Sequence, residues 1–264
     1  MITKTQRYLI EIAYHGGKYH GWQVQNNALT VQETVDAALS TLLRQTIRTL
    51  GCGRTDTGVH ARQLFAHFDY SLSGERGVLP EPERMVKGLN AILPDDIAVK
   101  SFCHVNPDFH ARFDAVSRAY EYHIHFGKDP FLTSFSWQLR DVPDVERMNE
   151  AARIMMGYHD FSCFSKAHTQ VMTNNCEIYS AEWKWLADGR LVFYISANRF
   201  LRNMVRAIVG TLLEIGHHKR SVESIRDTIE SKNRSVAGVS VPACGLYLTE
   251  VNYPPFKQNQ EADE

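Results

Sequence analysis

One acidic side chain, Asp56, stands in a glycine-rich stretch with the composition of a tight loop. Glycines occupy positions 51, 53 and 58; glycine accepts backbone angles that other residues avoid and lets a substrate approach the main chain. Arg54 lies two residues before Asp56, near enough to keep the carboxylate ionised and to contact a phosphate. We therefore interpret Asp56 as the catalytic residue. The alternative is a polar turn between two strands.

Three arginines, Arg199, Arg202 and Arg206, follow helical spacing in the stretch from residue 199 to 215. At about 100° per residue they fall in one sector, opposite leucine and valine side chains that can pack. Because guanidinium groups bind phosphate in a bidentate manner, this face is a candidate phosphate-binding surface. The alternative is the solvated face of an amphipathic helix. An arginine that reached Asp56 would also hold its carboxylate ionised.

Aromatic rings and cations alternate in a third stretch, and this mixture binds RNA by stacking on bases and pairing with phosphates. It comprises Phe109, His110, Ala111, Arg112 and Phe113, followed by Arg118 and Tyr120.

Other chemistry finds less support. Cys52 lies close to Asp56 but has no recognisable base partner for a thiol nucleophile. The triplet Asp56-Thr57-Gly58 resembles that of aspartic proteases, but Arg54 opposes the proton that two aspartates share there. The paired histidines at 123/125 and 217/218 have no acidic or thiol neighbours at metal-ligand spacing, so we expect no metal site.

The elements that must position these residues can be read from periodicity and end signals. Thr30 and Glu33 form a capping box that starts a helix. The Asp56 loop is expected to follow a strand at 46–50 and to precede one at 64–70. The remaining strands are expected at 8–14, 97–102, 118–126, 178–186, 191–197 and 246–251, and the remaining helices at 82–92, 145–156, 200–215 and 222–231.

This order of elements predicts the α+β class, with two α/β halves whose mixed, largely antiparallel sheets are flanked by helices. Asp188-Gly189 is a strong hairpin signal between two of the strands. Asn106-Pro107-Asp108 interrupts the pattern, so we place an N-terminal half at 1–105 and a C-terminal half at 106–253. The polar tail at 254–264 is expected to be disordered.

The composition, 44% hydrophobic and 22% charged over 264 residues, is that of a globular protein. A net charge of -1 gives no global sign of a nucleic-acid partner, so such a partner must be held by local basic patches. No apolar run is long enough to span a bilayer and the start lacks the core of a signal peptide. Five scattered cysteines fit reduced thiols. We expect a cytoplasmic protein.

Many separate blocks, in one order, resemble the TruA family of tRNA pseudouridine synthases. The blocks span nearly the whole chain: Tyr19-His20-Gly21-Trp22-Gln23, Val31-Gln32-Glu33, Gly53 to Ala61, Phe109 to Phe113, Arg118 to Tyr122, Gly157 to Phe161, Phe200 with Met204 to Gly210, and Gly245 to Leu248.

The resemblance implies the pseudouridine synthase fold and isomerisation of uridine to pseudouridine at positions 38 to 40 of the tRNA anticodon stem-loop, without cofactor or metal. It implies that Asp56 is catalytic, Arg54 helps to extrude the nucleotide, Tyr120 stacks on the uracil, Arg206 pairs with Asp56 and Leu246 packs beside the base. It also implies a homodimer whose subunits form one tRNA-binding surface.

The sequence departs from the family pattern at two places. Tyr14-His15-Gly16 stands where the family commonly has Tyr-Asp-Gly, which removes a carboxylate. Val171 to Cys176 stands where many members carry a basic residue. Both departures concern contacts with RNA rather than the chemistry.

Overall fold

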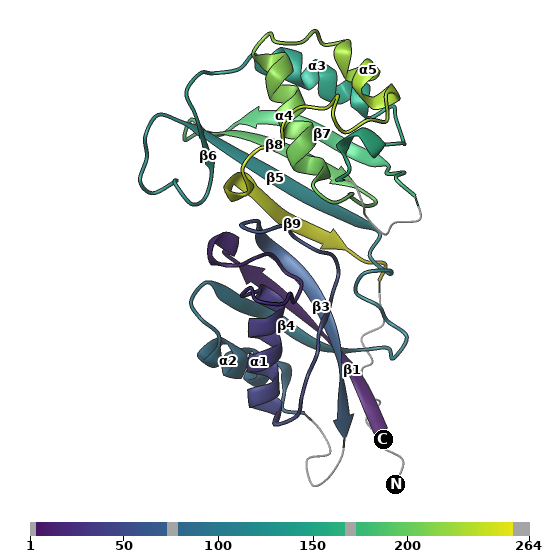
Figure 1. Ribbon diagram of the computed structural model, residues 1–264. Helices are drawn as coiled ribbons and strands as arrows, with labels where there is room; N and C mark the ends of the chain where they lie inside the picture. The colour runs from purple at the N-terminus through teal and green to yellow at the C-terminus, as the bar shows by residue number, and fades with distance from the viewer. Residues whose placement is uncertain (1–3, 73–78, 167–172, 256–264) are drawn as a thin grey trace. The chain divides into compact units, whose positions relative to one another are not determined.

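The computed structural model describes residues 4–72, 79–166 and 173–255, which form two compact units (Figure 1). Unit 1 comprises residues 1–116 and 250–264, and unit 2 comprises residues 117–249. Each unit contains strands, mostly paired antiparallel, and helices. The expected α+β class is therefore confirmed.

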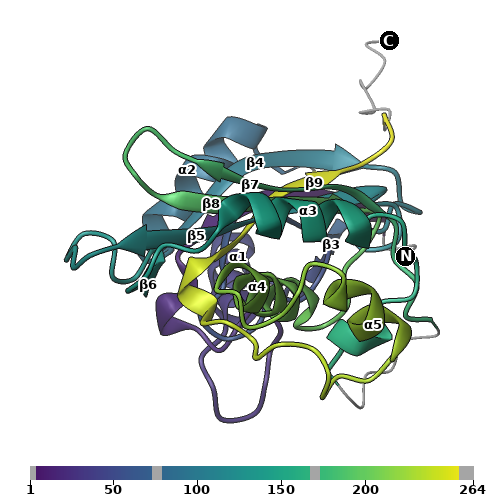
Figure 2. The ribbon, with the colours of Figure 1, turned by 90° about the horizontal axis from the view of Figure 1, so that it is seen from above.

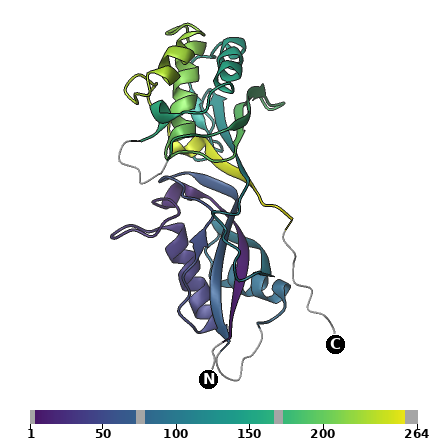
Figure 3. The same cartoon turned by 90° about the vertical axis from the view of Figure 1, so that its right-hand side faces the viewer.

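In unit 1 the central strand β1 (Lys4–Tyr14) pairs antiparallel with β3 (His60–Leu72) and with β4 (Ile97–Val105). The two-residue strand β2 (Leu50–Gly51) pairs with β3. Two helices, α1 (Val31–Leu43) and α2 (Pro82–Ile92), complete the unit; Figure 3 shows α1 running alongside the strands. Tyr8 packs on Phe68 and Phe102, with centroid distances of 5.8 and 5.1 Å. These three buried rings form part of the core of unit 1.

Unit 2 is built on the antiparallel strands β5 (Ser117–Phe126), β8 (Leu191–Ala197) and β7 (Ile178–Trp185), with β9 (Leu246–Asn252) beside β5. The short β6 (Trp137–Leu139) runs parallel to β5, which makes the sheet mixed. The helices are α3 (Val145–Met155), α4 (Met204–Gly216) and α5 (Ser224–Glu230). Figure 2 shows α3 and α4 on the same side of the strands. Single turns of 3-10 helix lie at Gly16–Lys18 in unit 1 and at Ser162–Phe164 and Ala243–Gly245 in unit 2.

The structure differs from the expected elements in two ways that affect the site. The strand expected at 46–50 is reduced to Leu50–Gly51. The helix expected from residue 200 begins only at Met204, because Asn203 adopts a left-handed conformation with φ of 67°. The tail expected to be disordered lies, from residue 256 onward, outside the described residues.

The division into units also differs from the expected boundary at residue 105. Asn106 does turn the chain, since its carbonyl accepts from the amide of Phe109 at 2.9 Å. The chain then returns to unit 1, where Phe109 O accepts from Arg7 Nη1 at 2.9 Å and Ala111 O accepts from the Tyr253 hydroxyl at 2.6 Å. The break is therefore a turn within unit 1, which ends at Val116.

Thr30 caps α1 as expected, because its Oγ1 accepts from the amide of Glu33 at 3.3 Å. We predict that Thr30→Ala lowers the free energy of unfolding by about 1 kcal/mol, since a first-turn amide loses its acceptor. Thr41→Ala is the control: Thr41 lies on α1, exposed, and bonds only a carbonyl within the helix. Urea denaturation followed by circular dichroism measures both variants, and equal midpoints would contradict the capping role.

Candidate active site

The loop that carries Asp56 connects β2 to β3 and is closed by its own main chain. The amide of Cys52 donates to Phe65 O at 2.7 Å, and the amide of Val59 donates to Asp56 O at 3.1 Å. The second bond forms a turn in which Gly58 has φ of 80°, a conformation that favours glycine. Asp56 is half-buried, whereas Cys52 and Val59 are buried. The loop therefore holds the carboxylate on a backbone fixed at both ends.

A second segment, residues 14–22, packs against the back of the Asp56 loop. A Cβ at Gly16 would lie 1.9 Å from Val59 O, and a Cβ at Gly21, where φ is 84°, would lie 2.3 Å from Thr55 O. The amide of Gly58 donates to Tyr19 O at 3.2 Å. Main chain therefore lies directly against main chain, at positions where no side chain fits.

Side chains of the same segment complete this support. The Tyr14 hydroxyl lies 2.8 Å from Thr55 Oγ1. The ring of Trp22, 1% exposed, lies against Gly51, where a Cβ would be 2.4 Å from the indole Nε1. The sequence analysis did not predict this support, although Gly16, Gly21 and Trp22, which lie between the first strand and the first α-helix, were the available signal.

His15, which departs from the family pattern, belongs to the same support. Its ring centroid lies 4.5 Å from that of the buried His60, and the amide of Gly16 donates to His60 Nδ1 at 3.0 Å. Nearby, the Tyr19 hydroxyl donates to Asp96 Oδ1 at 2.6 Å. Burial and this hydrogen bond raise the pKa of Tyr19, so its hydroxyl stays a donor at neutral pH.

Arg54 is exposed, and its Nε donates to Gln23 Oε1 at 3.2 Å. The sequence hypothesis placed Arg54 against the carboxylate of Asp56. The hydrogen bond from Arg54 reaches Gln23, which follows the segment that supports the loop.

In unit 2, Tyr120 lies on β5 opposite Ile195 of β8. Its ring meets that of Phe200 edge to face, with centroids 5.1 Å apart and planes at 87°. Tyr120 is half-buried. A neighbouring ring therefore fixes the orientation of Tyr120.

The predicted arginine face of a helix is wrong for two of its three members. Arg199 and Arg202 precede α4, which begins at Met204, so they do not share a helical sector with Arg206. The helix is also buried on nearly all sides, with Arg206 and Glu214 its only half-buried residues among Met204 to Gly216. Arg199 and Arg202 therefore lie before the helix and Arg206 lies in its first turn, so the three arginines do not form a stripe on one helical face.

Arg206 itself is held by the chain that leads to β9. Its Nε donates to Val241 O at 2.7 Å, and its own carbonyl accepts from the amide of Val241 at 3.2 Å. Leu246 follows at the start of β9 and is 6% exposed. The preceding Gly245 packs on Tyr122, where a Cβ would lie 2.9 Å from the ring.

The segment Phe109–Phe113 divides into buried and accessible members. Phe109 packs on Tyr253 at 5.2 Å between centroids, and Ala111 is fully buried with its amide donating to His67 Nδ1 at 3.2 Å. Phe113 is 73% exposed, and the guanidinium of Arg112 lies 5.6 Å from its ring centroid. The buried residues anchor the segment, and His110, Arg112 and Phe113 are left accessible.

The structure therefore brings the candidates together in two sets. Asp56 and Arg54 lie in unit 1 with the segment that supports their loop, and Tyr120, Arg206 and Leu246 lie in unit 2. Within the described ranges, no three His, Cys, Asp or Glu side chains are grouped as metal ligands. A search of the helices in the same part of the chain finds none long and apolar enough to cross a membrane.

Comparison with known proteins gives close relatives over nearly the full chain. A family model described as tRNA pseudouridine synthase matches residues 151–254. The protein named tRNA pseudouridine synthase A of Bacteroides fragilis is 48% identical over 94% of this chain and 97% of its own length. Proteins of the same name from Porphyromonas gingivalis and Anoxybacillus flavithermus are 49% and 42% identical, over 94% and 92% of this chain and 97% and 96% of their own lengths.

The fit of Gly21 against the Asp56 loop gives a stability prediction. Gly21→Ala combines φ of 84° with a Cβ 2.3 Å from Thr55 O, so we expect a loss of about 1 to 3 kcal/mol in the free energy of unfolding. Faster hydrogen exchange of the Gly58 and Val59 amides should accompany it. Gly53→Ala is the control, because nothing lies within 4 Å of its Cβ. Equal protection in the two variants would contradict the supporting role.

The bond between His67 and Ala111 gives a pH prediction. Burial first, and then the charges of Arg7 and His110, lower the pKa of His67 to about 4, whereas an unfolded histidine titrates near about 6.5. Above that pH the histidine is neutral in both states and its contribution to stability is complete. As pH falls from about 6.5 to about 4 the unfolded chain binds the proton first, so stability is lost, by about 1 to 3 kcal/mol.

Denaturation of wild type and His67→Asn across this pH range tests the prediction. The asparagine keeps an acceptor near Nδ1 but does not titrate, so the difference between the two proteins should grow with pH between about 4 and 6.5. Parallel curves would show that His67 does not set the pH dependence.

Proposed function

This chain belongs to the tRNA pseudouridine synthase A family, and we propose that it isomerises uridine to pseudouridine at positions 38, 39 and 40 of the tRNA anticodon stem-loop, with Asp56 as the catalytic residue. The observation that carries the role of Asp56 is its place on a half-buried loop whose main chain is fixed from behind by residues 14–22. A carboxylate held in this way keeps its position while a nucleotide approaches the front of the loop.

The reaction exchanges one glycosidic bond for another. The bond from uracil N1 to ribose C1′ breaks, a bond from C5 to C1′ forms, the proton on C5 is lost to solvent and N1 gains a proton. One ionised carboxylate can attack the ribose, add to the base, or remove a proton from the ribose. Asp56 is the group that we assign to this step, by one of these three routes.

The other site residues serve the flipped nucleotide. A stacked uridine must leave its helix, at a cost of about a few kcal/mol that a protein ring can offset. We assign this stacking role to Tyr120, whose ring is oriented by Phe200, and the packing beside the base to Leu246. Arg54 assists extrusion, and Arg206 pairs with Asp56.

We assign contacts with the RNA backbone and bases to the accessible side chains of the Phe109–Phe113 segment and to Arg199 and Arg202. Phe109 and Ala111 contribute by anchoring that segment, since both are buried. With a net charge of -1, one chain offers tRNA little overall attraction. We therefore propose a homodimer, in which the basic patches of two subunits together bind the tRNA.

We propose the cytoplasm as the compartment, because the five free thiols stay reduced there.

Replacing the catalytic carboxylate provides the test. Asp56→Asn should leave tRNA binding intact and lower isomerisation by roughly a thousandfold or more, because the amide can neither attack nor accept the proton. Tritium release from tRNA labelled at uracil C5 measures the rate. Asp95→Asn, an exposed carboxylate of the same unit, is the matched control and should keep the wild-type rate. Turnover by Asp56→Asn within about tenfold of wild type would contradict the assignment.

The competing hypothesis is a tRNA-binding protein that has kept the surface without catalysis. The presence of Arg54, Asp56, Tyr120 and Arg206 together argues against it. Mass-tagging of pseudouridine in tRNA from a deletion strain separates the two hypotheses and names the modified positions.

A further inference from the structure

Residues 236–241, which we call the strap, lie along one side of α4 and run in the opposite direction to the helix. The contacts follow in order: Arg206 meets Val241, Gly210 meets Val239 and Thr211 meets Gly238. Asn203, just before the helix, donates to Ser240 at 2.6 Å. The strap therefore contacts one side of α4 from Arg206 to Thr211.

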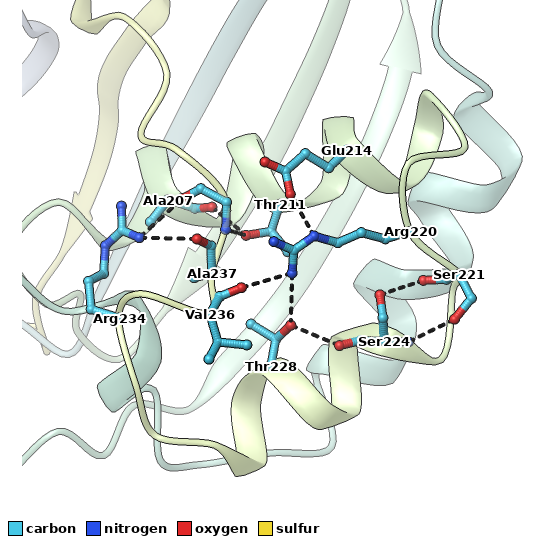
Figure 4. Close-up of polar contacts among 11 residues, drawn as sticks. Ala207, Thr211, Glu214, Arg220, Ser221, Ser224, Thr228, Arg234, Val236 and Ala237 are labelled. Atoms are coloured by element: carbon cyan, nitrogen blue, oxygen red, sulfur yellow. Dashed lines mark hydrogen bonds and ion pairs between the residues drawn. The ribbon is translucent and has the colours of Figure 1, made fainter.

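The strap lies unusually close to the helix. A Cβ at Gly210 would be 1.9 Å from Val239 O, and a Cβ at Gly238 would be 2.7 Å from Thr211 N. The amide of Gly238 donates to Thr211 Oγ1 at 2.8 Å, and this hydroxyl donates in turn to Ala207 O at 2.9 Å (Figure 4). Because main chain meets main chain, the strap has one position along the helix rather than a choice of several.

Arg206 takes its position from the strap on two sides. Its side-chain Nε donates to Val241 O at 2.7 Å, and its main-chain carbonyl accepts from the amide of Val241 at 3.2 Å. A guanidinium held at Nε keeps its plane fixed and its other nitrogens aimed in one direction. A displacement of Val241 therefore displaces the guanidinium of Arg206.

Arg234 fastens the strap near this point. Its Nη1 donates to Ala237 O at 3.4 Å and to Gly238 O at 3.1 Å, and its Nη2 donates to Ser240 Oγ at 2.8 Å. The same Ser240 oxygen accepts from Asn203. Asn203, which precedes α4, and Arg234 thus both donate to the Ser240 hydroxyl oxygen, next to Val241.

The other end of the strap is fastened separately. Arg220 donates to Val236 O at 2.8 Å and pairs with Glu214 Oε2 at 2.6 Å (Figure 4). Arg234 and Ser240 are therefore the side chains whose loss frees the part of the strap next to Arg206.

We propose that Arg234 and Ser240 are positioning residues that act on the reaction through Val241 and Arg206, without touching the RNA. This inference rests on the role of Arg206 in the proposed function. Loss of either residue should lower kcat and leave KM for tRNA unchanged, since the binding surface is intact and a catalytic-site guanidinium is misplaced.

Steady-state kinetics on Arg234→Gln and Ser240→Ala test the proposal. We expect kcat to fall roughly tenfold to a hundredfold, the scale on which small misplacements act, with KM within about twofold. Arg147→Gln is the matched control, because Arg147 also donates to two main-chain carbonyls, Ile215 O and Arg220 O, that lie outside the strap. It should lose comparable thermal stability and keep its kcat.

A double-mutant cycle distinguishes action through Arg206 from general loosening. Arg206→Lys should itself be slow, and adding Arg234→Gln to it should lower kcat little further, because residues that act through one group are not additive. Two results would overturn this inference alone. One is that Arg234→Gln and Ser240→Ala have the same kcat as Arg147→Gln, and the other is that the effects on kcat are fully additive in the cycle. A wild-type rate for Arg206→Lys would overturn the proposed role of Arg206 and the inference with it.

Discussion

The contact of main chain with main chain behind Asp56 is the constraint from which the arrangement of unit 1 follows. Val59 O and Thr55 O leave no room for a Cβ at Gly16 or Gly21. The loop therefore cannot move toward residues 14–22; the amide of Gly58 bonds Tyr19 O of that segment, and the amide of Val59 bonds Asp56 O within the loop. Main-chain contacts therefore hold the backbone that presents Asp56 and Arg54, and the side chains of Tyr14 and Trp22 add to this support.

In unit 2, side chains help to hold a candidate site residue in place. Here the candidate arginine, Arg206, stands on a helix that is buried on nearly all sides, and its side chain is held by the strap, which runs antiparallel along the helix. The segment is held by arginines that bond carbonyls, which satisfies main-chain acceptors that no strand or helix pairs. In both units, then, an irregular segment pressed against a regular one provides the rigidity near the candidate residues.

Features with local causes could be predicted from the sequence. The Thr30 cap and the bounds of α2 are set by neighbours a few residues away, Pro82 among them. The start of α4 could not be predicted, because the left-handed Asn203 bonds Ser240, 37 residues further along the chain. Helical periodicity continued through Arg199 and Arg202 for lack of any local stop signal. The turn at Asn106 was identified, but the compact unit continues to Val116, because the chain after the turn packs on residues of β1 and β3.

The last strand gives the molecule a property of a different kind. β9 starts in unit 2 at Leu246, while the residues from Glu250 onward belong to unit 1, where Val251 N bonds Gln63 and Tyr253 packs on Phe65 and Phe109. Unit 1 is thus assembled from the first and the last parts of the chain. On the ribosome, where the chain emerges from its N-terminus, unit 2 has all of its residues before unit 1 does. Unit 1, which carries Asp56, therefore receives its last residues only after all of unit 2 has been synthesised.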